Sequence, residues 1–373
     1  MNLNDDLLKF EEKVAFSLRE LYRRYGYTRY RMSRFEEYDL YARNKDFLSS
    51  DNIITFNDIG GRLMAMKPDM TMSIVRNTAS TGKNDIATRV YYDENVYRVS
   101  PRTHSFAEIH QVGLECIGTV DDYCVNEVLS LAAESLAAIS DDAVLQISHV
   151  GIVRDILNAC TQDPILQEKI LRCTVSKNKA DLLPLLEEAG ADQIAARRMI
   201  DLPDLDGEPE LFISTFRLYP HLFAVREEYI DALDGALQAA KAAAPNVRVR
   251  INFSTAGDMR YYNGIVFRGY VKGVPESVLS GGRYDLLPEH MGFKADAIGF
   301  AVSLDSLELL RREKDYDVDI LLLYGYDIPA ADVAAAVRQL TDEGNRVSAQ
   351  HVTPEGMRYR KKYLLDESGV YEA

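Results

Sequence analysis

The sequence predicts an α+β fold in which an antiparallel sheet is interrupted by a helical segment and followed by a short α/β segment. Over residues 53–117 strand-like segments follow one another without long helices between them, which favours antiparallel pairing. Residues 150–245 have an almost wholly helical pattern. Strand-like patterns then resume at 247–253, 262–271 and 297–302. Residues 317–343 have the pattern of one strand and one helix.

The N-terminal half begins with a predicted helix over residues 4–25, where apolar residues recur at helical spacing and Gly26 ends the pattern. Turn residues such as Asn57-Asp58 and Gly60-Gly61 separate the strand-like segments that follow. These segments are 53–56, 63–66, 88–92, 96–100 and 107–117. Residues 120–139 form the next predicted helix.

In the C-terminal half, a loop at 201–210 breaks the helical pattern, and residues 318–324 and 330–340 form the last predicted strand and helix. Together with the family resemblance given below, these patterns predict two parts. A core spans residues 1–315 and contains the mostly helical insertion at about 150–245, and an α/β segment spans 316–373.

Composition narrows the function classes. The 373 residues suffice for two or three domains, and 47% hydrophobic with 27% charged residues excludes a wholly disordered chain. No apolar run is long enough to cross a membrane, and the N-terminus does not resemble a secretory signal. Four cysteines without a CxxC pair indicate reduced thiols and a cytoplasmic protein. The net charge of −15 argues, weakly, against indiscriminate nucleic-acid binding.

Common cofactor signatures are missing, since the chain has no phosphate loop and no strand-linked GxGxxG, so no cofactor is expected. One cluster has metal-like spacing, namely His104, Glu108 and His110 in HSFAEIH. Such a set arises often by chance on a surface strand, so no metal site is expected either.

The segment HQVGLECIG places Gln111, Gly113 and Glu115 on one face of a predicted strand. The amide and the carboxylate lie about 13 Å apart at strand rise, and Gly113 leaves a slot between them about as long as a free amino acid. Taken alone, a bulge at Gly113 with both polar side chains in solvent is the favoured interpretation.

The segment KPDMT follows a predicted strand, and Asp69 or Thr71 would cap the next helix. The same carboxylate and hydroxyl could instead bind a ligand's ammonium group. Helix capping is the more frequent of the two uses, and the segment alone favours it.

The segments MRYYNGIVFRGYV and LSGGRYDLL combine paired tyrosines, Tyr261 and Tyr262, with a predicted double-glycine turn that carries Arg283 and Tyr284. Backbone packed close to a ligand would need such glycines. The alternative is a hairpin with an ordinary aromatic cross-strand pair.

In this order along the chain, KPDMT, YRVSP, HQVGLECIG, YYNGIVF, GGRYD and AIGFAVSLDSL resemble the class II histidyl-tRNA synthetase core over about residues 5–315. The resemblance implies an antiparallel sheet flanked by helices, with a pocket for histidine. The residues that match this pocket are Asp69, Thr71 and Gln111 near the ammonium group, Glu115 and Tyr262 at the imidazole, and Arg98, Tyr261 and Tyr284 beside them.

The resemblance also implies that the catalytic side is eroded. Arg98 is kept, but Ser100 stands in place of a glutamate, and HSFAE replaces a basic loop. Gly257 and Ser306 stand where the family has arginines. Because adenylate formation needs cations around its phosphates, the pattern predicts a chain that binds histidine without activating it.

A histidine pocket without phosphate-binding cations resembles the ATP phosphoribosyltransferase regulatory subunits, and Asp69 fits that branch. This resemblance implies a homodimer of the core, assembled with a short-form catalytic subunit and inhibited by histidine, with no role for tRNA or a membrane. The tail at 317–373 resembles a truncated anticodon-binding domain whose RYRKK segment (358–362) is expected on a solvated helix face. Ser33 replaces the proline of the class II dimer motif.

Two alternatives stay open. One is a divergent histidyl-tRNA synthetase that uses Arg98 with a substitute cation, Arg260 or Arg283. The other is a free-standing amino-acid sensor with another partner. Histidine-dependent pyrophosphate exchange would identify the first, and calorimetry against several amino acids would identify the second.

Overall fold

An eight-stranded sheet organises the N-terminal part of the chain, in the order β1-β5-β6-β11-β10-β9-β7-β8. All neighbours pair antiparallel except the two edge pairs, β1 with β5 and β7 with β8. The strands are β1 (Thr28–Arg29), β5 (Thr88–Val99), β6 (Phe106–Gly118), β7 (Ala143–His149), β8 (Arg248–Ile251), β9 (Ile265–Val271), β10 (Leu279–Arg283) and β11 (Asp296–Ser303). The predicted α+β class with a mainly antiparallel sheet is confirmed.

The computed structural model describes residues 8–48, 53–79, 86–99, 105–205, 207–218, 225–257, 259–310 and 316–373. The chain divides into two compact units, residues 1–309 and 310–373. The boundary expected between 315 and 316 lies at the end of a segment outside the described residues. Within the described ranges no helix is long and apolar enough to cross a membrane.

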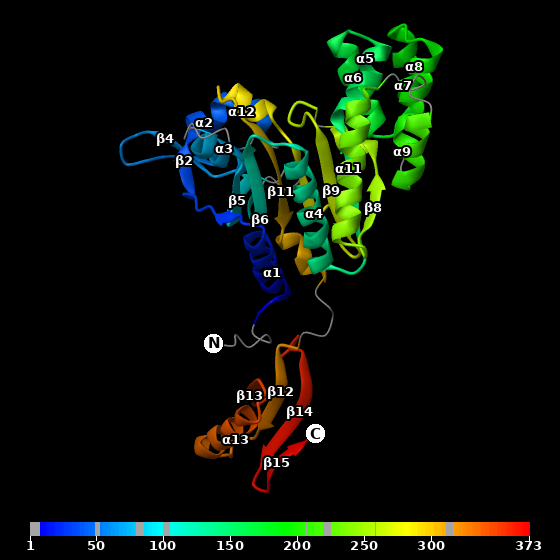
Figure 1. The fold of residues 1–373 in the computed structure, drawn as a ribbon. Coiled ribbons are helices and arrows are strands. Elements are labelled where there is room, and N and C mark those ends of the chain that lie inside the picture. Colours follow the sequence, from blue (N-terminus) through cyan, green and yellow to red (C-terminus); the bar gives the residue numbers. More distant parts are fainter. Residues whose placement is uncertain are drawn as a thin grey trace. The chain divides into compact units, whose positions relative to one another are not determined.

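Long helices cover one face of the sheet (Figure 1). They are α1 (Phe10–Arg24), α4 (Asp122–Ile139) and α11 (Glu227–Ala243). Helix α4 buries Val128, Leu129 and Leu136 completely, and it also packs along α11. Apolar residues recur through α4 at helical spacing, so burial of this stripe fixes the helix against the strands.

Shorter elements stand at the rim of the sheet. A three-stranded antiparallel sheet, β2 (Phe35–Glu37), β4 (Leu63–Met66) and β3 (Thr55–Asn57), projects from the main body (Figure 1). The helices here are α2 (Tyr38–Arg43), η2 (Lys45–Phe47), α3 (Thr71–Ala79), η4 (Phe253–Gly257), α12 (Leu286–His290) and η5 (Asp305–Leu310). The end of β4 leads through Lys67 and Pro68 directly to Asp69 and α3, so this small sheet is joined to the predicted ligand residues by a very short link.

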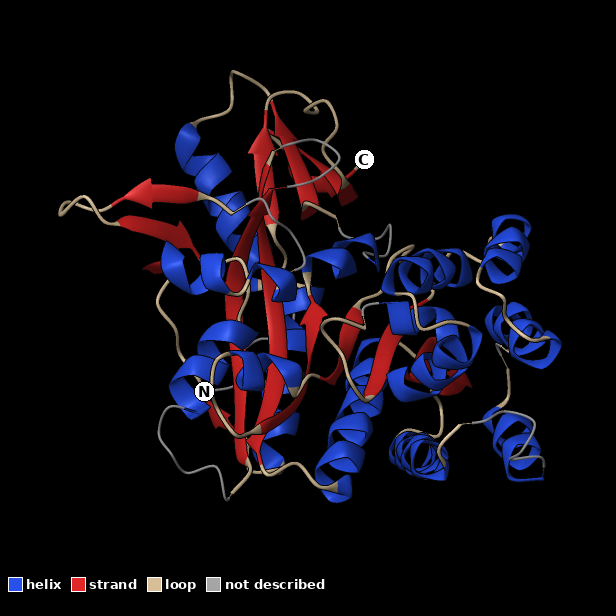
Figure 2. Cartoon of the chain, turned by 90° about the horizontal axis from the view of Figure 1, so that it is seen from above, coloured by secondary structure: helices blue, strands red, loops and turns tan. Residues whose placement is uncertain are grey.

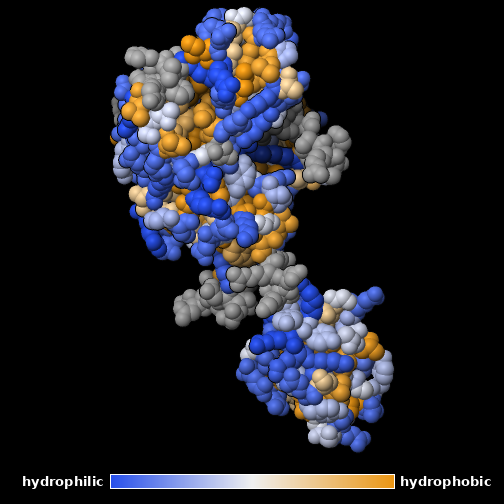
Figure 3. Space-filling model, turned by 90° about the vertical axis from the view of Figure 1, so that its right-hand side faces the viewer, coloured by the Kyte–Doolittle hydropathy of each residue, from blue (hydrophilic) through white to orange (hydrophobic). Residues whose placement is uncertain are grey.

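Between β7 and β8 the chain forms a group of helices beyond the β8 edge of the sheet (Figure 2). They are α5 (Val150–Cys160), α6 (Pro164–Val175), α7 (Lys179–Glu188), α8 (Gln193–Asp201), η3 (Leu202–Asp204) and α9 (Pro209–Leu218). On the face of the molecule seen in Figure 3, hydrophobic side chains gather among charged ones over this group of helices. The exposed large apolar residues of these helices are Ile165, Leu183, Ile194, Leu211 and Leu218.

The second unit contains β12 (Val318–Tyr324), α13 (Ala330–Asp342), β13 (Val347–Gln350), β14 (Tyr359–Asp366) and β15 (Gly369–Glu372). Its sheet has the order β13-β12-β14-β15, with β12 parallel to both neighbours. Helix α13 packs Val333 and Leu340 against Ile320 and Leu322 of β12. The unit therefore has a small hydrophobic core of its own.

Three local predictions in the N-terminal half need correction. The first helix begins at Phe10 instead of residue 4, and residues 1–7 lie outside the described residues. The strands expected at 88–92 and 96–100 are one strand, β5, because β6 pairs with it along its whole length, including Asp93 to Asn95. The strand β7, which the sequence pattern missed, lies between β8 and β9.

Three further corrections concern the C-terminal half. The expected double-glycine turn is wrong, because Gly281 and Gly282 lie within β10 and pair with strands on both sides. The strand expected from residue 262 begins only at Ile265. RYRKK does not form a helix face, since Tyr359 starts β14, which pairs with β12 and β15. For the two glycines and for RYRKK, strand pairing with distant residues overrides the local pattern.

Candidate functional site

A pocket of about 180 Å³ lies on the face of the sheet over β5, β6, β10 and β11. All eight residues that the sequence predicts for the ligand site line it, namely Asp69, Thr71, Arg98, Gln111, Glu115, Tyr261, Tyr262 and Tyr284. They come from five separate segments of the chain. The fold therefore brings together residues up to 215 positions apart in the sequence (69 to 284).

Glycines form the floor of this pocket. Glu115 of β6 pairs with Gly299 of β11, which pairs with Gly282 of β10, so these three positions share one row across the sheet. A Cβ on Gly299 would overlap the Glu115 carboxylate, and a Cβ on Gly282 would overlap the ring of Tyr262. The glycines therefore leave room for the two side chains that define this end of the pocket.

Gly113 serves the same purpose one row further along. It pairs with Tyr92 of β5, and the ring end of Tyr92 occupies the space that a Cβ of residue 113 would need. The strand register runs unbroken through Gly113 on both sides, so the alternative of a bulge is wrong. Gln111 and Glu115 line the pocket on either side of this glycine, as the alternation along β6 predicts.

Glu115 is the buried polar centre of the pocket, with 2% of its surface exposed. Thr71 Oγ1 donates a hydrogen bond of 2.9 Å to its Oε1, and the Tyr284 hydroxyl donates to its Oε2. Burial raises the pKa of Glu115 to about 8, although the hydrogen bonds from Tyr284 and Thr71 oppose this change. The Glu115 carboxyl group therefore holds a proton near neutral pH.

Three tyrosines surround this carboxyl group. The ring centroids of Tyr261 and Tyr262 are 4.7 Å apart, and those of Tyr261 and Tyr284 are 5.6 Å apart. Burial raises the pKa values of Tyr261 and Tyr284 well above their ordinary value, so both hydroxyls stay protonated. The result is a small aromatic compartment with hydroxyl groups and one carboxyl group as its polar contacts.

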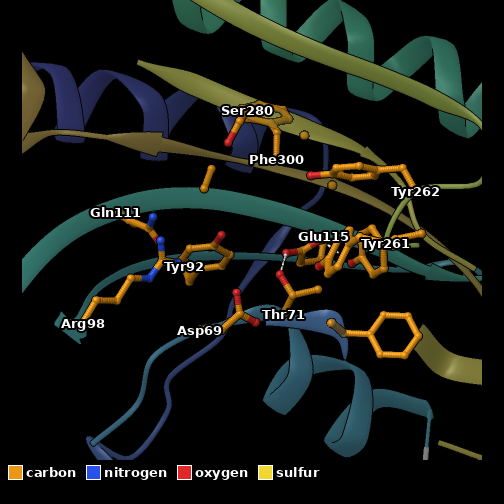
Figure 4. Close-up of a pocket in the computed structure, with 15 residues that line it drawn as sticks. Asp69, Thr71, Tyr92, Arg98, Gln111, Glu115, Tyr261, Tyr262, Ser280 and Phe300 are labelled. Atoms are coloured by element: carbon orange, nitrogen blue, oxygen red, sulfur yellow. Dashed lines mark hydrogen bonds between the residues drawn. The ribbon is translucent and has the colours of Figure 1, made fainter. Parts of the chain in front are cut away.

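The opposite end of the pocket carries charged and amide groups (Figure 4). In this view Arg98 and Gln111 lie at one end, and Glu115, Tyr261 and Tyr262 lie at the other. Asp69 is half-buried and lies just before α3, where its Oδ1 accepts a hydrogen bond of 3.0 Å from the Met72 backbone N–H. The capping role expected for this segment is thus confirmed, and the same carboxylate also faces the pocket.

Sequence reasoning missed seven other lining residues: Phe47, Tyr92, Ser280, Gly281, Gly299, Phe300 and Ala301. Tyr92 lies directly opposite Gly113, so the sequence gives no sign of it without the strand register. Gly281 and Gly299 stand in the segments GGRYD and AIGF, where glycines within a strand pattern were an available signal of close approach.

The structure shows the surroundings of several positions at which the resemblance implies lost or substitute phosphate-binding cations. Gly257 lies in η4, and Ser306 lies in η5, where its Oγ is 3.5 Å from Ser303 Oγ. Arg283 pairs with Asp285 at 2.7 Å and with Asp296 at 3.1 Å, so two carboxylates already neutralise it. Arg260, the other suggested substitute cation, is exposed in a turn and does not line the pocket. Ser100 and residues 101–104 lie outside the described part of the chain.

Metal ligation finds no support within the described ranges, where no group of three or more His, Cys, Asp or Glu side chains could hold a metal ion. His110 Nε2 instead pairs with Asp93 Oδ1 at 2.6 Å, which raises the pKa of the imidazole. His104, the first residue of the candidate metal cluster, lies outside the described residues.

The comparisons place the chain in a protein family. The family model described as Histidyl-tRNA synthetase matches residues 2–307, and the chain therefore belongs to that family. A crystal structure titled as an ATP phosphoribosyltransferase regulatory subunit/histidyl-tRNA synthetase from Bacillus halodurans C superposes with a TM-score of 0.72 at 22% identity. It covers 95% of this chain and 93% of the other. The predicted class II synthetase-like fold is confirmed.

Among curated relatives, the name ATP phosphoribosyltransferase regulatory subunit recurs. The protein of that name from Oceanobacillus iheyensis is 24% identical over 99% of this chain and 91% of its own length. The one from Moorella thermoacetica is 29% identical over 87% of this chain and 84% of its own length. A Histidine--tRNA ligase from Methanocaldococcus jannaschii is 28% identical over 85% of this chain and 75% of its own length. The expected resemblance to the regulatory subunits is confirmed.

Proposed function

We propose that this chain is a non-catalytic regulatory subunit of ATP phosphoribosyltransferase that binds histidine and acts with a short-form catalytic subunit in the cytoplasm. The observation that carries the proposal is the pocket. It brings together all eight residues matched to the histidine site, and Arg98 is the one cation among the described residues that line it. Curated relatives that match most of the chain bear the name of this subunit. A solved ATP phosphoribosyl transferase (HisG:HisZ) complex from Thermotoga maritima contains a chain with the same fold, at a TM-score of 0.62.

The pocket has polar groups suited to each end of a histidine molecule. At one end Asp69 and Gln111 offer oxygen acceptors to an ammonium group. At the other, Glu115 and the Tyr262 hydroxyl offer one partner to each imidazole nitrogen. A carboxyl group that holds its proton at neutral pH can donate it to the unprotonated ring nitrogen, so neutral histidine would gain two specific contacts.

Adenylate formation would demand more positive charge than this site provides. The transition state carries several negative charges on phosphate oxygens, and cations at those oxygens are worth orders of magnitude in rate. Among the lining residues within the described ranges, Arg98 is the one cation. The substitute Arg283 is occupied by two aspartates and does not line the pocket. These contacts favour ligand binding without activation.

Inhibition by histidine would follow if the ligand binds one state of the assembly more tightly than the other. A ligand shifts an equilibrium between two states only by its difference in affinity for them, and typical coupling is about 1–3 kcal/mol. We further propose that the core, residues 1–315 with its insertion at 150–245, forms the homodimer that carries this site. Residues 316–373 would form a truncated anticodon-binding-like segment.

Reconstitution tests the proposal. The short-form catalytic chain is assayed for phosphoribosyl transfer alone, with this chain, and with this chain plus histidine. We expect transfer to appear or rise on addition of this chain and to fall again with histidine. We expect Glu115→Ala to remove the inhibition while keeping the activation, because this variant loses the carboxyl group that would contact the imidazole. The control is Glu108→Ala, since Glu108 lies on the same strand and outside the pocket.

Two results would replace this proposal with another. Histidine-dependent exchange of pyrophosphate into ATP by the chain alone would identify a divergent synthetase. Histidine binding without any effect on the catalytic chain would identify an amino-acid sensor with another partner.

A further inference from the structure

Arg98 makes a backbone contact that the sequence does not suggest. It lies near the end of β5, and its Nε donates a hydrogen bond of 2.9 Å to the carbonyl oxygen of Pro68. Pro68 precedes Asp69, and a proline has no backbone N–H. The carbonyl is therefore the only backbone group through which Pro68 can be held, and Arg98 holds it with a charge-assisted hydrogen bond.

The neighbouring residue is held from other directions. The Lys67 side chain is fully buried and pairs with Glu94 at 3.3 Å. Its backbone N–H donates to the Arg34 carbonyl, and its carbonyl accepts from the Tyr97 N–H. Position 67 is thus fixed on both sides by the main chain, whereas one step later Arg98 supplies the contact to the backbone of Pro68.

Arg98 also acts on the charge of Asp69. Burial raises the pKa of the Asp69 carboxyl, and the Arg98 guanidinium is the first influence that opposes this change. The Met72 and Thr71 backbone N–H groups act in the same direction. An ammonium ligand binds best to an ionised carboxylate. Arg98 favours that form of Asp69 and also holds the residue that precedes it.

We propose that Arg98 is a positioning residue, which orients the Pro68–Asp69 segment for the ligand's ammonium group, and that it does not bind the ligand's carboxylate. The inference rests on the proposed histidine binding and deepens it. It departs from the role that the family resemblance implies for Arg98, a contact to carboxylate or α-phosphate. A lysine would keep the charge but would lose the fixed Nε donor, so it would restore only part of the function.

Three ligands separate the two roles of Arg98. Histidine has both end groups, histamine has the ammonium group without the carboxylate, and 3-(imidazol-4-yl)propionate has the carboxylate without the ammonium group. Each is titrated calorimetrically into the full-length wild type and Arg98→Gln. We expect Arg98→Gln to lower the affinities for histidine and histamine by the same factor, roughly tenfold or more, because a charge-assisted hydrogen bond is lost. The affinity for the propionate should stay within about twofold of that of wild type.

The inference would be overturned if Arg98→Gln lowered the affinities for histidine and the propionate and left the affinity for histamine unchanged. Unchanged affinity for all three ligands would overturn it as well. A wild type that binds none of them would instead refute the proposed histidine site, and the role of Arg98 with it. The outcomes for the two proposals are therefore distinguishable.

The pH dependence gives a second readout that a general loss of structure would not produce. Without Arg98 the pKa of Asp69 rises, so the affinity of Arg98→Gln for histamine should climb with pH over a higher range than in wild type. An unshifted profile would contradict the inference. Arg98→Lys should lie between the two, and it replaces Arg98→Gln if that variant does not fold.

The matched control is Arg268→Gln. Arg268 is exposed on β9 and pairs with the pocket residue Ser280 across the sheet, so its removal changes the charge near the site by the same amount. The hydrogen bond from Arg98 Nε to the Pro68 carbonyl oxygen stays in place in this variant. We expect this variant to bind all three ligands as wild type does, and equal weakening in both variants would mean that net charge alone explains the effect.

Discussion

Gly299→Ala tests the glycine floor of the pocket most directly. A Cβ at this position overlaps Glu115 Oε2 and Cδ, and it also overlaps the Leu114 carbonyl oxygen, which is backbone and cannot turn away. The substitution therefore forces β11 and β6 apart locally and pushes the Glu115 carboxyl out of line with Thr71 and Tyr284.

The expected cost follows from two contributions. Overpacking a closely packed interior destabilises by about 1–3 kcal/mol. Weakening the hydrogen bonds that Thr71 and Tyr284 make to Glu115 adds about 1 kcal/mol. We expect the free energy of unfolding to fall by about 2–4 kcal/mol and the affinity for histidine to fall roughly tenfold or more.

Urea unfolding and histidine titration measure both effects. Gly207→Ala is the control, because a Cβ there meets nothing within 4 Å and should change the free energy of unfolding by less than about 0.5 kcal/mol. If Gly299→Ala unfolds at the same urea concentration as wild type and binds histidine normally, the reasoning about the glycine floor is refuted.

Three other predictions follow from the structure. Protonated Glu115 stabilises the folded state fully below its ordinary pKa of 4.5, and this contribution is lost as the pH rises through about 8. Urea unfolding from pH 5 to 9 should therefore show a steeper loss of stability in wild type than in Glu115→Gln. Lys67→Met removes the ion-pair partner of Glu94 and should lower the free energy of unfolding by about 2 kcal/mol. The double variant with Glu94→Gln should regain part of this free energy, and a double-mutant cycle measures the difference. Because residues 310–373 have their own core, their removal should leave the urea midpoint of the remaining chain unchanged, and a lower midpoint would contradict the division into two units.

Sequence reasoning reached the site through the family resemblance, because the polar segments at 69–71 and 111–115, taken alone, favoured ordinary structural roles. The alternation of Gln111, Gly113 and Glu115 fixed which side chains share a face before any pairing was known. The family resemblance then added Asp69 and Tyr262 from distant segments. Gln111, Glu115, Asp69 and Tyr262 all line the pocket, so the order of the motifs along the chain predicted which segments meet there.

What the sequence could not supply depends on pairing between strands far apart in the chain. Tyr92 enters the site because of its register opposite Gly113, and that register depends on twelve paired positions. The double glycine at 281 and 282 resembles a turn until two neighbouring strands are known. The backbone contact of Arg98 to Pro68 depends on a side-chain conformation that no residue pattern encodes.

The glycine floor also limits how the binding specificity of this pocket can evolve. A floor made of main chain has no side chain left to shorten, so single substitutions at Gly282 and Gly299 can only add bulk and make the compartment smaller. A bulkier amino acid could be admitted only by trimming the aromatic walls, and those same rings supply the hydroxyl groups. Evolution can therefore narrow the choice of ligand one mutation at a time, whereas widening it would require several coordinated changes.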